Sequence, residues 1–229
     1  MHFVNFKSNP QLTPFAPNYS YFLVEETIKN FVKFSSLKNY LIKKEKTILK
    51  KPIIKIKATK ISIDGYTNLG KNSTTARYNQ YNIFTWKNKE ITNLKKAIIY
   101  CHEEFLKKLK VKIDKPVYIS GWFNVMKKGQ SIDKHLHSVT PNCYLSGNVC
   151  VSCNKTSTFY INPINQINDP AVFESKNEIG KIVIFQSNIP HYTNKHNSAK
   201  DRITIAFDLW LGNPEHFNQA VRRVPTSCR

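Results

Sequence analysis

Long apolar runs are missing from this 229-residue sequence. No stretch approaches the ~20 consecutive apolar residues that a membrane-spanning helix needs, so we expect no membrane partner. The first residues also lack a basic stretch followed by an apolar run and a small-residue cleavage site, which argues against a secretory signal. We therefore expect a cytoplasmic protein, built as one domain with a helical extension.

Cysteine is present but forms no disulfide framework. The five cysteines are an odd number and their spacing is irregular. Cys150 and Cys153 make a lone CxxC, without a second pair, in a segment typical of a strand. We expect buried thiols here, with a zinc or redox role as the alternative.

Acidic residues and arginine are both scarce. The chain has 35 Lys plus Arg against 15 Asp plus Glu, a net charge of +20. This charge favours contact with a polyanion such as nucleic acid, or with an acidic protein. Nearly all of the excess is lysine, however, and a chain also rich in Ile, Asn and Tyr is what an AT-rich genome would encode. Arginine, which suits phosphate and base recognition, is found only as Arg77, Arg202, Arg222, Arg223 and Arg229.

Helical periodicity is confined to the first half of the chain. The segment 21–47 has apolar residues among lysines without Pro or Gly, and 89–110 carries an apolar stripe in steps of three and four, so both predict helices. Residues 1–20 are expected to be an extended lead-in, and Asp64-Gly65 marks a hairpin turn. The polar segment 66–88 predicts a surface loop, with a lid over the site as the alternative.

From residue 116 onward, short segments rich in Val, Ile, Tyr and Phe are separated by turn residues. No helical pattern lies between them, which favours an antiparallel double-sheet or barrel-like core over a parallel sheet. The fold class is thus mostly β with flanking helices (α+β). The predicted strands are 117–126, 143–151, 157–162, 180–186 and 203–211. We divide the chain into an N-terminal helical region with a hairpin packing on the core (1–115), the core (116–212) and a basic tail (213–229).

Three histidines are candidate metal ligands. His135 and His137 lie two apart, and residues i and i+2 of an extended segment point to the same side. His191 follows the apolar segment Ile182–Phe185 and a turn at Pro190, so a facing strand can bring it to the same point. Neutral imidazole suits Fe, Zn, Cu or Ni, and a three-ligand site leaves positions for co-substrate and dioxygen or water.

Arg202 is a candidate anion clamp. It begins the last predicted strand with Thr204 on the same face, and a guanidinium beside a hydroxyl binds a carboxylate well. Each of these residues alone is a weak signal, because HxH pairs arise by chance and single arginines commonly pair with surface carboxylates. Together they are more specific.

The combination resembles the double-stranded β-helix dioxygenases that use Fe(II) and 2-oxoglutarate, and it looks most similar to the group common in marine bacteria and their phages. The resemblance covers roughly residues 117–211. It rests on these segments in order: Trp122-Phe123-Asn124, Gly129, His135-Leu136-His137, Leu145-Ser146-Gly147, Phe159, Asn162-Pro163, Gly180–Phe185, Pro190-His191 and Arg202–Asp208.

The resemblance implies a jelly-roll core and the chemistry of the family. Arg202, helped by Thr204, would grip the 5-carboxylate of 2-oxoglutarate, and Asn124 resembles an asparagine that contacts the co-substrate in some alkylation-repair members. The implied reaction uses O2, with ascorbate as a stimulant, to hydroxylate a C–H bond of a protein, nucleic-acid or small-molecule substrate. It releases succinate and CO2, and the chain is expected to be bacterial or viral. The implied Fe(II) ligands are His135, His137 and His191.

Two positions depart from the family pattern. Most members have HxD…H, whereas His137 stands where that carboxylate would be, so the site loses one negative charge and would hold Fe(II) less tightly. Asp133, two residues before His135, does not fit the motif. Met126 stands where repair enzymes commonly have tyrosine.

Other functions stay open at this point. A cupin-type metalloenzyme that does not use 2-oxoglutarate would need the same histidines but not Arg202. A non-enzymatic basic nucleic-acid-binding protein would carry these histidines incidentally. A degenerate oxygenase fold could serve as an interaction module.

Overall fold

The computed structural model describes residues 1–8, 13–54, 67–137, 142–164, 172–212 and 224–226. The predicted hairpin at Asp64-Gly65, Cys228 and most of the tail lie outside these residues. The elements follow one another as β1 (His2–Lys7), β2 (Ser20–Thr27), α1 (Phe34–Leu49), the 3-10 helices η1 (Thr75–Gln80) and η2 (Ile83–Thr85), α2 (Lys89–Leu109), β3 (Val117–Met126), β4 (Cys143–Ser152), β5 (Ser157–Ile161), β6 (Val172–Lys176), β7 (Lys181–Gln186), β8 (His191–Thr193), β9 (Arg202–Leu211) and β10 (Val224–Pro225).

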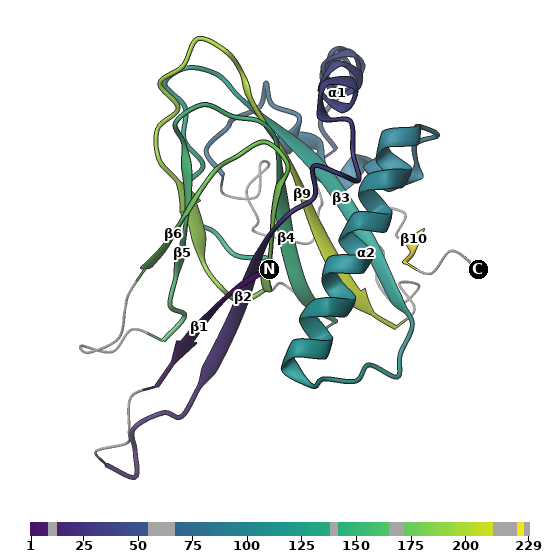
Figure 1. Cartoon of the computed structure of the whole chain (residues 1–229). Helices are drawn as coiled ribbons and strands as arrows, with labels where there is room; N and C mark the ends of the chain where they lie inside the picture. Colours follow the sequence, from purple (N-terminus) through teal and green to yellow (C-terminus); the bar gives the residue numbers. More distant parts are fainter. Residues whose placement is uncertain (9–12, 55–66, 138–141, 165–171, 213–223, 227–229) are drawn as a thin grey trace.

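A large antiparallel sheet runs through the molecule in the order β1-β2-β7-β4-β9-β3-β10. Strand β9 lies inside this sheet and pairs along its length with β3 on one side and β4 on the other (Figure 1). Side chains alternate between the two faces of a strand. One face of β9 therefore carries Arg202, Thr204, Ala206 and Asp208, and the opposite face is apolar.

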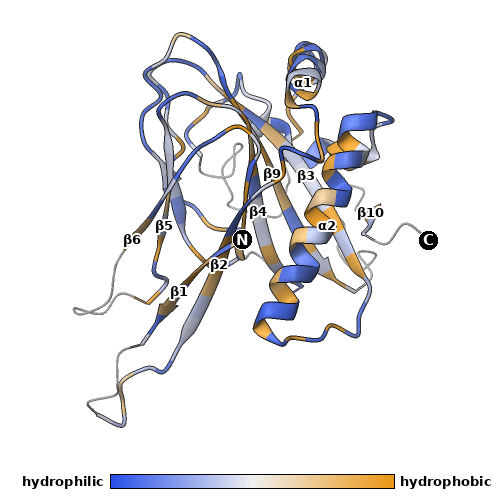
Figure 2. Ribbon diagram, viewed as in Figure 1, coloured by the Kyte–Doolittle hydropathy of each residue, from blue (hydrophilic) through white to orange (hydrophobic). Residues whose placement is uncertain are grey.

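The apolar face of this sheet packs against the two helices. Ile203, Ile205 and Phe207 of β9 belong to the same buried cluster as the inner stripes of α1 and α2. Figure 2 shows hydrophobic and hydrophilic residues alternating in bands along α2, and its buried residues include Ile91, Leu94, Ile98 and Phe105. The helix begins at Lys89 because the side chain of Asn88 accepts from the backbone N–H groups of two residues in its first turn.

A smaller antiparallel sheet, in the order β6-β5-β8, faces the other side of the large sheet. Tyr160 of β5 reaches across to contact Phe185 of β7, and its hydroxyl accepts from Asn148 of β4 at 2.6 Å. The two sheets therefore enclose an interior with its own apolar cluster, which consists of Phe6, Leu23, Tyr160, Val183, Phe185 and Ile189.

Most predicted strands and the helix at 89–110 are confirmed, but the N-terminal prediction is wrong in part. Residues 20–27 form β2 rather than the start of a helix. The predicted extended lead-in contains a strand, β1, at His2–Lys7. Leu23 points into the interior cluster and Val24 into the helix-side cluster, so both faces of β2 are buried. A strand buried on both faces lacks the alternation that reveals strands in sequence.

The prediction of a plain surface loop at 66–88 is also wrong for its second half. η1 and η2 pack against β3, and Tyr81 lies between Phe123 and Trp86. Part of the predicted tail likewise forms β10, which pairs with β3. Within the part of the chain that the structure describes, neither helix is long and apolar enough to span a membrane.

Candidate metal centre

The three candidate histidines are brought together by backbone pairing. The segment that carries His135 and His137 runs antiparallel to β8 and the turn before it. The backbone N–H of His135 donates to the carbonyl of His191 at 3.1 Å, and the reverse bond is 2.9 Å. The N–H of His137 donates to the carbonyl of Ser187 at 3.1 Å. His135 and His191 thus stand directly opposite each other, and His137 lies two residues further along the same segment.

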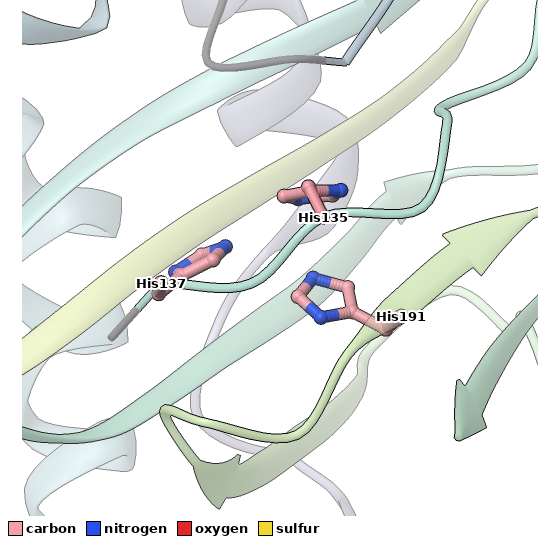
Figure 3. Close-up of side chains that lie close together, drawn as sticks. All are labelled: His135, His137 and His191. Atoms are coloured by element: carbon pink, nitrogen blue, oxygen red, sulfur yellow. The ribbon is translucent and has the colours of Figure 1, made fainter. Parts of the chain in front are cut away.

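The imidazoles converge in the interior (Figure 3). One potential ligand atom from each of the three lies within 4.8 Å of the others, and together they could hold a metal ion. His137 and His191 are buried, whereas His135 is half-buried. The site is therefore enclosed on one side and open at His135.

Hydrogen bonds fix which ring nitrogen faces the shared space. Nδ1 of His135 lies 2.8 Å from the carbonyl oxygen of Asp133, and Nδ1 of His191 lies 3.2 Å from that of Ile189. A carbonyl oxygen only accepts, so both Nδ1 atoms carry the proton and Nε2 keeps its lone pair. Burial, and then the two neighbouring histidines, hold the pKa of His191 well below its usual value. A neutral imidazole is the form that binds a metal.

His137 has a different partner. Its Nδ1 lies 2.7 Å from Oδ1 of Asp208, and the same oxygen lies 2.7 Å from the hydroxyl of Ser146. Neither Asp208 nor Ser146 is predicted as a site residue from the sequence. The sequence offers one indication for Asp208: side chains alternate along a strand, so Asp208 falls on the same face of β9 as Arg202. The side chain of Asp133, in contrast, is exposed and lies outside the histidine cluster.

Arg202 lies on the interior face of β9 and is 2% exposed. Its Nη1 lies 3.0 Å from the sulfur of Met126, and its Nε has no hydrogen-bond partner in the described part of the chain. Among the described residues, no carboxylate forms an ion pair with it. Arg77 shows the contrast, because its buried guanidinium donates to backbone carbonyls of Leu49, Lys51, Lys71 and Ser73.

Thr204 and Asn124 are paired across β9 and β3 beside Arg202. Both are buried. The amide oxygen of Asn124 accepts from the hydroxyl of Thr75 at 2.7 Å, which holds the amide by one end. The three predicted co-substrate residues therefore lie on one interior face, and Thr75 adds an orienting contact that the sequence did not suggest.

Aromatic rings border the histidines. Phe185 lies edge-on to His191 with ring centroids 4.7 Å apart, on the closed side. Trp122 lies 5.4 Å from the ring of His137 and contacts Tyr78 in turn, and both are half-buried. Burial, followed by the nearby Asp208 carboxylate, raises the pKa of Tyr78.

The other candidate groups lie apart from this centre. Cys150 is buried and Cys153 is half-buried, and no third ligand lies near them among the described residues. His102 instead contacts the hydroxyl of Tyr144 at 2.6 Å, between α2 and β4. His196 is fully buried in the loop before β9 and contacts the carbonyl of Lys200.

Comparison with known proteins agrees with this geometry. Residues 120–208 match the sequence model of a family described as "Putative 2OG-Fe(II) oxygenase". A comparison with curated proteins finds no match.

Three solved structures share the fold at a TM-score of 0.52 each. A prolyl-4-hydroxylase of Pseudomonas putida is 9% identical, with 83% of this chain and 93% of that chain covered. A prolyl hydroxylase of Trichoplax adhaerens, in complex with a hypoxia-inducible-factor peptide fragment, is 10% identical and covers 82% and 83%. The non-haem, alpha-ketoglutarate-dependent epimerase SnoN is 9% identical and covers 82% and 76%.

At these identities the likeness concerns the fold, and it confirms the predicted double-stranded β-helix core. The family match adds the class of chemistry to that fold. The match of residues 120–208 to a 2OG-Fe(II) oxygenase domain, on this fold, therefore supports a 2-oxoglutarate-dependent iron oxygenase.

Proposed function

We propose that the chain hydroxylates a C–H bond of its substrate and couples this to the oxidative decarboxylation of 2-oxoglutarate. One atom of O2 enters the substrate and the other enters succinate, with release of CO2. His135, His137 and His191 would hold Fe(II), which activates the dioxygen when bound. The donor set supports this assignment because three neutral imidazoles leave coordination positions open.

The observation that carries the proposal is the cation of Arg202, which forms no ion pair with any residue that the structure describes. A buried charge without a partner is expensive, and buried arginines are normally neutralised or fully hydrogen-bonded. Arg77 meets this rule, whereas Arg202 has a sulfur contact and a free Nε. An anion from outside the chain would complete its environment.

The surroundings of Arg202 suit a carboxylate. The hydroxyl of Thr204 and the amide nitrogen of Asn124 are donors on the same interior face, and neither forms a side-chain bond that uses them within the described residues. Thr75 occupies the amide oxygen of Asn124, so the amide presents its N–H groups instead. These donors would bind the 5-carboxylate of 2-oxoglutarate and so orient its other end toward the histidines.

The rest of the chain would exclude water and present the substrate. Phe185 and Tyr160 cover the closed side of His191. The half-buried rings of Trp122 and Tyr78 border the histidines beside His137, and we expect them to contact the substrate. The same fold serves proteins described as prolyl hydroxylases and as an epimerase. The fold alone therefore does not decide the substrate class, which would depend on the residues that border the histidines.

The test is anaerobic addition of Fe(II) and 2-oxoglutarate to the purified protein. We expect a weak visible charge-transfer band, followed by slow succinate formation when O2 is admitted. His191→Ala should abolish the band because it removes a buried ligand, whereas His2→Ala, at an exposed histidine of β1, should leave it unchanged.

The outcomes separate the alternatives. Bound iron without a band or succinate would contradict the use of 2-oxoglutarate and favour a cupin-type enzyme. Failure to bind iron at all, with polyanion binding that survives chelators and His191→Ala, would favour a non-enzymatic nucleic-acid-binding protein.

A further inference from the structure

The three histidines differ in what lies behind them. His135 and His191 donate from Nδ1 to neutral backbone carbonyls, whereas Nδ1 of His137 faces the carboxylate of Asp208 at 2.7 Å. In all three arrangements Nδ1 is the nitrogen that faces an oxygen, so Nε2 is the atom that would bind a metal. Only that of His137 places a negative charge next to the ligand.

Asp208 is built into this position. It is 7% exposed on the interior face of β9, opposite Ser146 of β4 in the sheet register. The hydroxyl of Ser146 lies 2.7 Å from the same oxygen that faces His137, and 2.9 Å from the hydroxyl of Ser187. The backbone of Ser187 in turn accepts from the N–H of His137. One small network therefore holds both the ring and the main chain of His137.

The carboxylate has no cation to balance it. Among the described residues, Asp208 forms no ion pair with a lysine or arginine, although the chain carries a net charge of +20. Within those residues its one ionic contact is His137. A buried carboxylate without a cation is costly unless positive charge arrives by another route, and a divalent ion bound to the far nitrogen of the same ring would supply it.

We infer that Asp208 is a positioning residue that gives His137 the negative charge lost with the HxD carboxylate. The carboxylate does not bind the metal itself. It acts on the metal through its hydrogen bond to the imidazole of His137. The hydrogen bond orients the ring, fixes its tautomer and makes Nε2 a stronger donor. This inference rests on the proposed function in assuming a metal at the three histidines.

The experiment measures binding of Co(II) alone, without 2-oxoglutarate or substrate, by its visible d–d absorption at one pH. Loss of a partner behind a metal-bound histidine commonly lowers metal affinity by about 10- to 100-fold. Asp208→Asn, which keeps an accepting oxygen but loses the charge, should show a loss in this range. Ser120→Ala is the matched control, because Ser120 is buried directly across from Asp208 on β3 but contacts Trp210 instead of His137. Its affinity should stay within threefold of the original.

A double-mutant cycle tests whether Asp208 acts through His137 or merely supports the fold. In a His137→Asp background the ligand is itself a carboxylate, so Asp208→Asn should change Co(II) affinity by less than threefold. A loss of tenfold or more in both backgrounds would assign Asp208 a general structural role and overturn the inference. So would an unchanged affinity in Asp208→Asn alone.

The same measurements distinguish a failure of the proposed metal site from a failure of the role of Asp208. If the unaltered protein binds neither Co(II) nor Fe(II), the metal site itself is refuted. If it binds both and Asp208→Asn binds equally well, the metal site stands and only the role of Asp208 falls. Should Asp208→Asn fail to fold, Ser146→Ala removes a donor from the same carboxylate oxygen. It should alter the Co(II) spectrum, and an unchanged spectrum would count against the inference.

Discussion

Replacing Arg202 with methionine should weaken 2-oxoglutarate binding while stabilising the protein in its absence. Arg202 is buried and has no counter-ion among the described residues. Removing one member of a buried, hydrogen-bonded charge pair costs about 2–5 kcal/mol of binding free energy. At 1.4 kcal/mol per factor of ten, the dissociation constant for 2-oxoglutarate should rise about 30- to 4,000-fold.

The effect on folding should have the opposite sign. Replacing buried ionic groups by apolar residues of similar volume often stabilises proteins by about 1–4 kcal/mol. With a urea dependence of about 2 kcal/mol/M, the unfolding midpoint of Arg202→Met should rise by about 0.5–2 M in the absence of ligand. Addition of 2-oxoglutarate should then raise the midpoint of the original protein but not that of the variant.

Arg77→Met is the matched control. It also removes a buried guanidinium, and the four backbone carbonyls that accept from Arg77 would lose this donor, which should destabilise the protein by about 2–4 kcal/mol. Its affinity for 2-oxoglutarate, measured by titrating the anaerobic Fe(II) band, should be unchanged. The reasoning is refuted if both variants are destabilised alike, or if Arg202→Met binds 2-oxoglutarate within threefold of the original.

Two further predictions concern stability. Burial lowers the pKa of His102 from 6.5 to about 4, so the folded state excludes a proton that the unfolded state accepts. Its contribution is complete above pH 6.5 and is lost as the pH falls toward 4, by about 2 kcal/mol at pH 5. Urea unfolding between pH 8 and 5 should show a shallower decline for His102→Gln, and parallel curves would contradict the assignment. Gly147→Ala should lower the free energy of unfolding by about 1–3 kcal/mol or more, because a Cβ there would meet the ring of Phe207 and lie 2.6 Å from the carbonyl of Val183. An unchanged unfolding midpoint for that variant would show that β4 can shift away from its neighbours.

The interior face of β9 connects these expectations. Arg202 and Thr204 stand at its beginning and Asp208 near its end, on alternate positions of one strand. The first pair would serve the co-substrate and the last residue the metal ligand. Because β9 is paired with β3 on one side and β4 on the other, the spacing between Arg202, Thr204 and Asp208 is fixed by the sheet.

Local patterns predicted elements well wherever one face is buried and the other is not. The helix 89–110 shows an apolar stripe of period 3.6, and its observed bounds, Lys89–Leu109, agree closely. The strand 117–126 is observed as Val117–Met126. β2 was mistaken for helix because it is buried on both faces, and the short strands β6 and β8 carry too few residues to display any period.

For the site, too, some features follow from the sequence and others only from the tertiary structure. The sequence by itself determined the residue types and their order: two histidines at i and i+2, a third after a turn, and an arginine opening the last long strand with a threonine on its face. Those facts follow from covalent spacing and strand parity, so they can be read without a structure.

Only the tertiary structure decided which groups those residues face. The pairing of residues 135 and 191 brings the imidazoles together, and the position of β9 between β3 and β4 sets Asn124 beside Thr204 and Asp208 behind His137. It also distinguishes the two buried arginines: Arg77 donates to backbone carbonyls, whereas Nε of Arg202 has no partner among the described residues. Contacts between segments so distant in sequence depend on sheet register, which no local pattern encodes.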